Sequence, residues 1–243
     1  MSGRHDERVT PVAVAIMAKA PRPGEVKTRL CPPLAPEDAA ALYRCFLLDK
    51  IAQVRTVSGA AALIAYAPAS ARREFQALAP GLRLHPQRGE DLGARLLSLL
   101  SELLAEGHAA AVAVDSDTPT LPARLLQDAV DRLSRPGPDV VLGPTDDGGY
   151  YLIGVRAARR ELFEGIAWST PAVLRQTLER AGAAGLSAEC LTPWFDVDTP
   201  GDLARLQTAL AAADDGPAAH TARFLAASSL PPPGGVVHHG SHR

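Results

Sequence analysis

The chain has few cysteines, few aromatic residues and no excess of positive charge, and each shortage excludes a class of protein. Its three cysteines, Cys31, Cys45 and Cys190, are widely spaced and form no C-x-x-C pair. This spacing excludes a disulfide framework and a cysteine zinc site. A formal net charge of -2 excludes a general nucleic-acid binder, which would carry a basic surplus. We therefore expect no nucleic-acid partner and a reducing, cytoplasmic compartment.

Long hydrophobic runs are also absent. No stretch approaches the length needed to cross a bilayer, and residues 1–8 lack the apolar region of a secretory signal. We therefore expect no membrane partner. The hydrophobic fraction of 47% in 243 residues is ample for a buried core. The sequence does not indicate an oligomeric state.

Apolar runs alternate along the chain with helical patterns. Residues 9–18 form a continuous apolar run, typical of a strand that is buried on both faces. Further strands are predicted at 61–67, 82–85, 109–114, 139–142, 150–155 and 188–191, and helices at 36–57, 69–79, 91–106, 120–133, 170–181 and from 199. This alternation predicts an α/β fold: a Rossmann-like, doubly wound, mostly parallel sheet with helices on both faces.

The composition changes near residue 214. Residues 9–213 are predicted to form a single domain. Residues 214–243 are rich in Ala, Pro, Gly and His and have no sustained pattern, so we interpret them as a mobile C-terminal tail with at most one short helix at 218–227.

A basic loop follows the first predicted strand. Residues 19–30 hold four cations together with a glycine and a threonine: Lys19, Arg22, Gly24, Lys27, Thr28 and Arg29. In α/β proteins phosphates bind at this position, where a glycine allows close backbone approach. A solvated basic loop is the alternative. The place directly after a buried strand favours a phosphate site, although the Walker pattern is absent.

Two acidic pairs stand at predicted strand ends. Asp115 and Asp117 follow the run 109–114, and Asp196 and Asp198 precede a Thr-Pro helix start. One carboxylate from each end suits a Mg²⁺ or Mn²⁺ ion that keeps waters and phosphate oxygens as its other ligands. Asp117 and Asp198 are the better ligands. Asp115 is a third candidate, although an Asp there often only caps the next turn, and for Asp196 we favour a supporting role.

Three other segments are candidates for binding the substrates. The run Asp146-Asp147-Gly148-Gly149-Tyr150 is either a turn between two strands or a set of acids and flat rings that holds a sugar or another polyol. Gln87 and Gly93 lie in a polar loop that enters a helix, which either reads a base or ribose or simply starts the helix. Trp168 and Ser169 precede a Pro-opened helix, where they contact an acceptor or only cap the helix.

Together these motifs resemble the GT-A-fold nucleotide-diphospho-sugar transferase superfamily, and within it a bacterial family generally described as glycosyltransferases. The matching motifs lie at 18–30, 115–117, 146–154, 168–171 and 196–203, so the resemblance covers about residues 10–210. The chain is more distantly similar to the molybdenum-cofactor and phospholactate guanylyltransferases. They share the first loop, an acid at Asp117 and the ending at 196–203, but carry different motifs at 146–151.

The resemblance implies a nucleotide over the first half of the sheet and an acceptor over the second. It also implies that Asp117 and Asp198 hold the metal on the pyrophosphate, with charge there stabilised by the cations of the basic loop. For glycosyl transfer, Asp146 or Asp147 is the candidate base for the acceptor hydroxyl.

Three hypotheses follow. The leading one is a metal-dependent glycosyltransferase that moves a sugar from a nucleotide sugar to a small acceptor. The second is a nucleotidyltransferase that couples a nucleoside triphosphate to a phosphorylated small molecule, because four cations suit a triphosphate. The third is a non-catalytic nucleotide or sugar sensor, since fold does not fix function. For either enzyme, Lys27 is expected to be a solvent-facing catalytic charge whose removal leaves stability almost unchanged.

Overall fold

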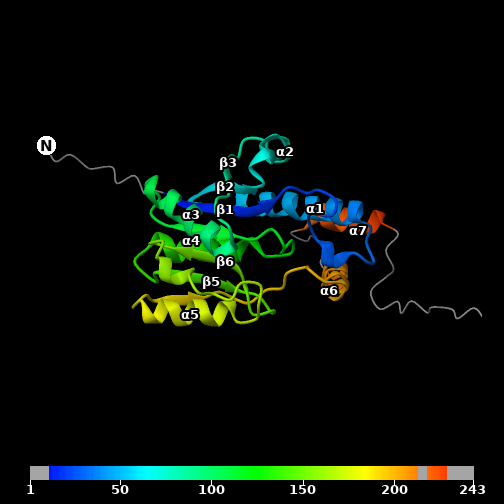
Figure 1. Ribbon diagram of the computed structural model, residues 1–243. Helices are drawn as coiled ribbons and strands as arrows, with labels where there is room; N and C mark the ends of the chain where they lie inside the picture. The colour runs from blue at the N-terminus through cyan, green and yellow to red at the C-terminus, as the bar shows by residue number, and fades with distance from the viewer. Residues whose placement is uncertain (1–10, 213–217, 229–243) are drawn as a thin grey trace, which may run out of the picture.

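The computed structural model describes residues 11–212 and 218–228, which contain one seven-stranded sheet in the order β3-β2-β1-β4-β6-β5-β7 (Figure 1). The strands are β1 Val12–Lys19, β2 Ala60–Ala67, β3 Arg83–Pro86, β4 Ala111–Val114, β5 Val140–Pro144, β6 Tyr150–Val155 and β7 Ala188–Cys190. Among these strands, β6 alone runs antiparallel to its neighbours β4 and β5. The predicted Rossmann-like, mostly parallel sheet is confirmed.

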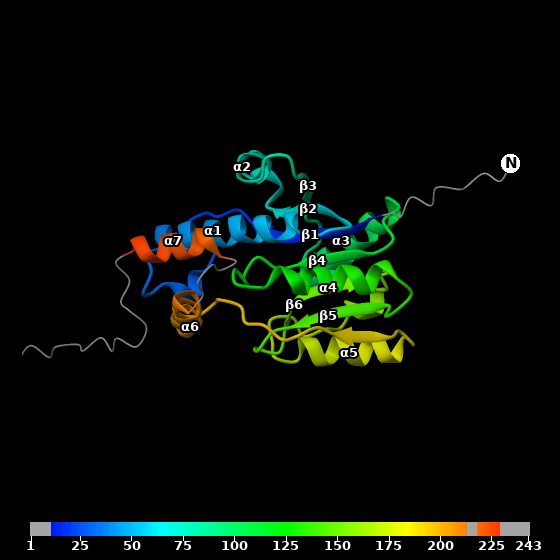
Figure 2. The same cartoon turned by 180° about the vertical axis from the view of Figure 1, so that it is seen from behind.

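Helices cover both faces of the sheet (Figures 1 and 2). They are α1 Pro36–Arg55, α2 Arg72–Leu78, α3 Leu92–Ala105, α4 Ala123–Ser134, α5 Val173–Ala183, α6 Pro200–Ala211 and α7 Ala219–Ala227, with 3-10 turns η1 Thr28–Leu30, η2 Ala69–Ala71 and η3 Arg160–Leu162. Buried side chains of α1, α2 and α4 form one core with the sheet, and those of α3 form a second core on the opposite face, against which α5 packs.

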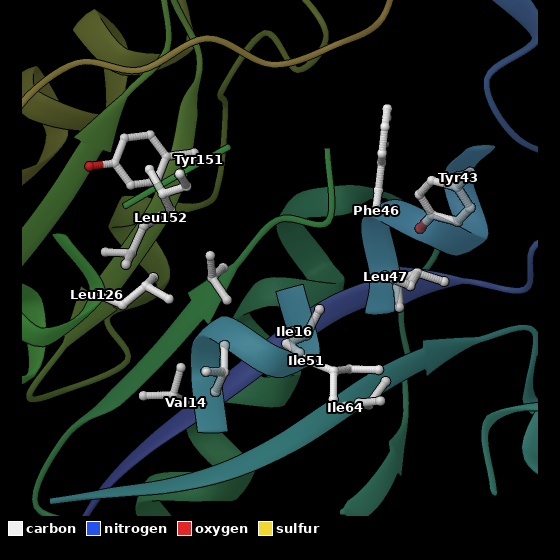
Figure 3. Close-up of a cluster of buried hydrophobic side chains, with 14 of the residues drawn as sticks. Val14, Ile16, Tyr43, Phe46, Leu47, Ile51, Ile64, Leu126, Tyr151 and Leu152 are labelled. Carbon is white, nitrogen blue, oxygen red and sulfur yellow. The ribbon is translucent and has the colours of Figure 1, made fainter. Parts of the chain in front are cut away.

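Alternation along β1 divides the two cores. Val14 and Ile16 belong to the α1 side, whereas Ala13 and Ala15 belong to the α3 side. In Figure 3, Val14 and Ile16 lie beside Ile51 of α1. A parallel strand that is buried on both faces needs apolar residues at every position, which explains the continuous run read from the sequence.

The direction of β6 decides where the β5–β6 turn lies. β4 and β5 are both antiparallel to β6, so they run in the same direction. β1 is parallel to β4 and therefore shares that direction. The turn at residues 145–149 therefore lies at the edge formed by the carboxyl ends of the parallel strands. This is the edge at which open α/β sheets bind ligands.

The predicted short helix near the C-terminus is confirmed as α7, but it is docked rather than mobile. It packs beside α1. The buried Asp49 of α1 accepts hydrogen bonds from the backbone N–H groups of His220 and Thr221, both at 2.9 Å. A carboxylate at a helix N-terminus satisfies donors that the helix leaves unpaired. The other residues of the predicted tail, 214–217 and 229–243, lie outside the described residues.

Within the described parts of the chain, no helix combines the length and the apolar character required to span a membrane.

Candidate active site

The loop after β1 delivers Lys27 into the interior. Lys27 precedes η1 with a left-handed backbone (φ 49°), a conformation that costs energy for a residue with a side chain and that clusters at functional sites. Its carbonyl accepts from the Leu30 N–H at 2.9 Å. The side chain is only 4% exposed, and Nζ lies 5.9 Å from the centre of the Tyr43 ring and 5.7 Å from that of Phe46.

Two carboxylates from distant parts of the sequence meet at this ammonium group. Nζ of Lys27 is 2.7 Å from Oδ1 of Asp198 and also forms an ion pair with Oδ1 of Asp117. The Val197 N–H donates to the Asp117 carbonyl at 3.0 Å, which joins the two acidic segments. Burial lowers the pKa of Lys27, but the two carboxylates outweigh it, so the pKa lies above its ordinary value. The prediction that Lys27 faces the solvent is therefore wrong.

Asp117 and Asp198 are also the pair selected from the sequence as metal ligands. Their side chains are 37% and 38% exposed. Among the described residues no group of three or more potential ligand side chains surrounds one point. Two carboxylates fit a hard cation such as Mg²⁺ that takes its remaining ligands from phosphate and water.

Asp115 has hydrogen-bond partners of its own. Its Oδ1 accepts from the Thr118 hydroxyl at 2.6 Å, and Nζ of Lys50 donates to the hydroxyl and the carbonyl of Thr118 at 2.8 and 2.9 Å. Burial raises the pKa of Asp115, against the opposing charge of Lys50. The third predicted metal ligand therefore takes part in a buried network beneath the loop.

Lys50 is a residue that the sequence interpretation missed. It is fully buried on α1, and burial lowers its pKa, although nearby carboxylates oppose this change. A signal was present, because Lys50 lies four residues after Phe46 and three after Leu47, on the apolar face of the helix.

A first pocket of about 220 Å³ opens beside the ends of β1, β2 and β3. Its lining is Lys19, Ala20, Glu25, Ala67, Pro68, Gln87, Gly89 and Arg95. The structure thus brings together Lys19 and Gln87, two predicted nucleotide ligands. The Gln87 amide donates to the carbonyls of Ala65 and Ala18 at 2.7 and 3.2 Å, so its orientation is fixed. Arg95, at the start of α3, donates to the Gly89 carbonyl at 3.0 Å.

The remaining predicted nucleotide ligands lie outside this lining. Arg22 pairs with Glu74 at 2.5 Å, Gly24 and Thr28 are exposed, and Arg29 belongs to a different pocket. Gly93 is buried, and a Cβ there would lie 2.6 Å from the indole nitrogen of Trp168. Gly93 therefore allows close packing of α3 against Trp168, and its contact with a nucleotide stays a prediction.

A second pocket of about 300 Å³ lies at the β5–β6 turn and the segment before α6. Five aspartates dominate its lining, which is Arg29, Asp146, Asp147, Phe195, Asp196, Asp198, Thr199, Asp202 and Arg205. Burial, followed by the charges of Asp147 and Asp198, raises the pKa of Asp196 to about 6. The pocket shares Asp198 with the Lys27 centre.

The two candidate bases differ in their partners. Oδ2 of Asp146 pairs with Arg205 at 2.6 Å. Oδ1 of Asp147 accepts from the Thr145 hydroxyl at 2.6 Å and from the Gly149 N–H at 3.0 Å. Asp147 is thus held by its own turn, and no described residue forms a hydrogen bond to its Oδ2.

The five predicted acceptor ligands shape the turn and its support and line neither pocket. Gly148 has a φ of 88°, and a Cβ there would lie 2.3 Å from the Pro171 carbonyl oxygen. Gly149 closes the Asp147 turn. Tyr150 and Trp168 pack edge to face at 6.4 Å against the α3-side core, and Ser169 is exposed. The turn between two strands, which was the simpler interpretation of residues 146–150, is present, and an acceptor role for these five residues stays a prediction.

The comparisons with known proteins agree with the fold. Residues 50–170 match the family described as "Uncharacterized protein conserved in bacteria (DUF2064)". A crystal structure from Desulfovibrio desulfuricans G20, described as a "putative nucleotide-diphospho-sugar transferase", is 32% identical with a TM-score of 0.82, over 88% of this chain and 94% of that one. No curated protein matches the chain.

Two cytidyl enzymes share the fold at low identity. CMP:2-keto-3-deoxy-manno-octonic acid synthetase, complexed with CTP, is 15% identical with a TM-score of 0.52, over 83% of this chain and 98% of that one. 4-Diphosphocytidyl-2C-methyl-D-erythritol synthase from Anaerococcus prevotii DSM 20548 is 10% identical with a TM-score of 0.55, over 84% and 97%.

Proposed function

The chain belongs to the nucleotide-diphospho-sugar transferase superfamily, and from this we propose that it is a metal-dependent glycosyltransferase. It moves a sugar from a nucleotide-sugar donor to the hydroxyl group of a small acceptor that carries no negative charge. The neighbour described as a putative nucleotide-diphospho-sugar transferase and the synthetase complexed with CTP support a nucleotide substrate.

The charge difference between the two pockets is the observation that carries this proposal. The first pocket holds Lys19 and Arg95 against one acid, Glu25, which suits an anionic nucleotide. The second pocket holds five aspartates against two arginines. Like charges at short range repel, so this pocket disfavours the phosphorylated acceptor that the nucleotidyltransferase hypothesis requires.

Asp117 and Asp198 are the residues that would hold Mg²⁺ or Mn²⁺ on the donor diphosphate. A bound divalent cation supplies charge stabilisation to the leaving nucleoside diphosphate. Lys27 and Lys19 add positive charge for the same group, so that catalysis is largely electrostatic and positional. Arg22 contributes little, because Glu74 engages it.

Asp147 accepts the proton in this proposal. The acceptor oxygen forms a bond to the anomeric carbon, and the bond from that carbon to the diphosphate oxygen breaks. The nucleoside diphosphate leaves with the electron pair, while the hydroxyl proton passes to Oδ2 of Asp147. The turn bonds to Oδ1 hold the carboxylate in place, as general-base catalysis requires.

Product analysis tests the proposal. The protein is incubated with Mg²⁺ or Mn²⁺ and a panel of nucleotide sugars, with polyols and sugars as acceptors, and Asp117→Asn serves as the control for contaminating activity. We expect release of nucleoside diphosphate, and thermal stabilisation by nucleotide sugars, because a ligand of the native state raises its stability. Release of pyrophosphate from a nucleoside triphosphate would instead establish the nucleotidyltransferase alternative.

A further inference from the structure

Lys27 occupies the position between the two carboxylates that the proposed function assigns to the metal. Its ammonium bonds to Oδ1 of Asp117 and Oδ1 of Asp198. The aromatic rings of Tyr43 and Phe46 lie near the same group. The carboxylates are more than a third exposed, whereas the lysine is 4% exposed. The pair is therefore accessible to a cation, but its charge is already half neutralised by an internal one.

The backbone of Lys27 is held by the turn that follows it, and its buried ammonium group lies at the end of a long side chain. The left-handed residue directly precedes η1, and the Leu30 N–H bonds to its carbonyl. A lysine carries a compact charge on a flexible four-carbon stem, and its ammonium donates to any oxygen within reach. Carboxylate and phosphate oxygens are interchangeable partners for such a group.

We propose that Lys27 is an exchangeable counter-ion that makes divalent-cation binding conditional on the donor diphosphate. A free cation competes with the ammonium for the Oδ1 atoms and binds weakly. When the cation arrives with a diphosphate, the ammonium exchanges its carboxylate partners for phosphate oxygens, and the carboxylates become available. This inference rests on the proposed function and adds an order to it: the nucleotide and the cation bind together.

The chain offers a matched control in Arg29. Its guanidinium lies 3.8 Å from Oδ2 of the same Asp198, but it is 70% exposed and does not contact Asp117. An exposed, longer ion pair contributes little. Arg29→Ala therefore removes one positive charge from the same loop without releasing the carboxylate pair.

The test is a titration of four proteins with Mn²⁺ alone: wild type, Lys27→Met, Lys27→Gln and Arg29→Ala. Electron paramagnetic resonance of the free ion measures the binding. We expect both Lys27 variants to bind free Mn²⁺ roughly ten-fold more tightly than wild type, within the usual range of coupling between two sites, and Arg29→Ala to differ by less than about three-fold. Equilibrium dialysis of ADP, CDP, GDP, UDP and dTDP at saturating Mn²⁺ should show the opposite sign, with the Lys27 variants about ten-fold weaker.

The outcomes separate the two claims. If wild type binds one of these nucleotides with Mn²⁺, but folded Lys27 variants bind free Mn²⁺ no more tightly, the exchange is wrong and the proposed function stands. If wild type binds none of the five nucleotides with Mn²⁺, the proposed function is itself overturned. Circular dichroism establishes which variant is folded. If neither is, tight binding of Mn²⁺ alone to wild type overturns the exchange, and weak binding that strengthens with nucleotide supports it.

Discussion

The first and second pockets lie at the same edge of one sheet, but they are formed by different kinds of structural element. The first is formed where β1, β2 and β3 end and α3 begins, all in the parallel half of the sheet. The second is formed by the β5–β6 turn, next to the antiparallel strand, and by the segment before α6. One lining has a slight excess of positive charge, and the other has five aspartates against two arginines.

This difference shows how one sheet edge can receive two substrates of different charge. The parallel half presents the start of a helix to an anionic ligand, the arrangement that α/β folds use for phosphates. In the acidic half, burial and neighbouring carboxylates hold the pKa of Asp196 at about 6, which shows how crowded the negative charge is. The centre formed by Lys27, Asp117 and Asp198 adjoins the second pocket, since Asp198 also lines that pocket.

The largest expected effect comes from the Lys27 centre, whose Asp198 also lines the second pocket. Asp117→Asn and Asp198→Asn should each lower turnover by roughly two to three orders of magnitude, the usual result of removing one preorganised electrostatic group. Steady-state release of nucleoside diphosphate measures this. The control is Asp128→Asn on α4, which removes a carboxylate that pairs with Arg132. Folded Asp117 and Asp198 variants with undiminished turnover would contradict metal-dependent transfer.

A test within the acidic pocket asks whether it acts through one carboxylate or through its total charge. Asp147→Asn should lower turnover about 100-fold while keeping the turn, because an amide oxygen can accept the Thr145 and Gly149 bonds. Asp146→Asn should have an effect of less than about three-fold, because Asp146 forms an exposed pair with Arg205. Equal effects of the two substitutions would show that the pocket acts through its total negative charge and that Asp147 is not a specific base.

Removal of Lys27 should impair both turnover and stability. Lys27→Ala should lower turnover at least about ten-fold, and Lys27→Arg should restore only part of it because a planar fork differs from a compact charge. The variant leaves two neighbouring carboxylates without their shared cation. We therefore expect the free energy of unfolding to fall by about 1–2 kcal/mol, measured by urea denaturation. Unchanged stability would show that the buried ion pairs are energetically neutral.

Much of the fold could be predicted from the sequence because its signals are local. Continuous apolar runs identified β1 and β4, and Leu spacing identified α3, whose bounds agree closely with the structure. Asp117 and Asp198 were predicted to lie near each other from two acidic segments, although Asp198 lies in the segment between β7 and α6 rather than at a strand end. In each case the physical cause acts within a few residues of chain or through the general geometry of parallel sheets.

The failures share a different cause, which is tertiary contact. Nothing local distinguishes Arg22, which Glu74 of α2 engages, from Arg29, which lines a pocket. The burial of Lys27 depends on α1, whose Tyr43 and Phe46 lie beside it. The close approach of Gly93 to Trp168 likewise joins segments that are far apart in the sequence.

A smaller effect is expected in the first pocket. Lys19→Ala should raise the KM for the donor about five-fold with little change in kcat, because its charge binds substrate and transition state alike. The effect should weaken at high salt, since such contacts are screened. The matched control is Arg22→Ala, which removes a cation of the same loop that pairs with Glu74 and should leave the KM nearly unchanged. A larger effect of Arg22→Ala would return this residue to the donor site.

The smallest effect concerns Asp202, which lines the acidic pocket but has a structural role. Its Oδ2 accepts from the Thr199 N–H at 2.8 Å and completes a capping box at the start of α6. Burial raises the pKa of Asp202, but bonds from Thr199 and Asp198 outweigh it, so the pKa lies below its ordinary value.

A carboxyl group with a lowered pKa stabilises the native state above its unfolded pKa of about 4, and this contribution disappears as the pH falls through the lower, folded value. Asp202→Ala should therefore lower the free energy of unfolding by about 1 kcal/mol at pH 7. This loss should become progressively smaller as the pH falls below about 4. Urea denaturation of both proteins at several pH values measures the difference. If the difference does not change with pH, the effect comes from packing of the Asp202 side chain. The charge of Asp202 would then not stabilise the start of α6, which lines the acidic pocket.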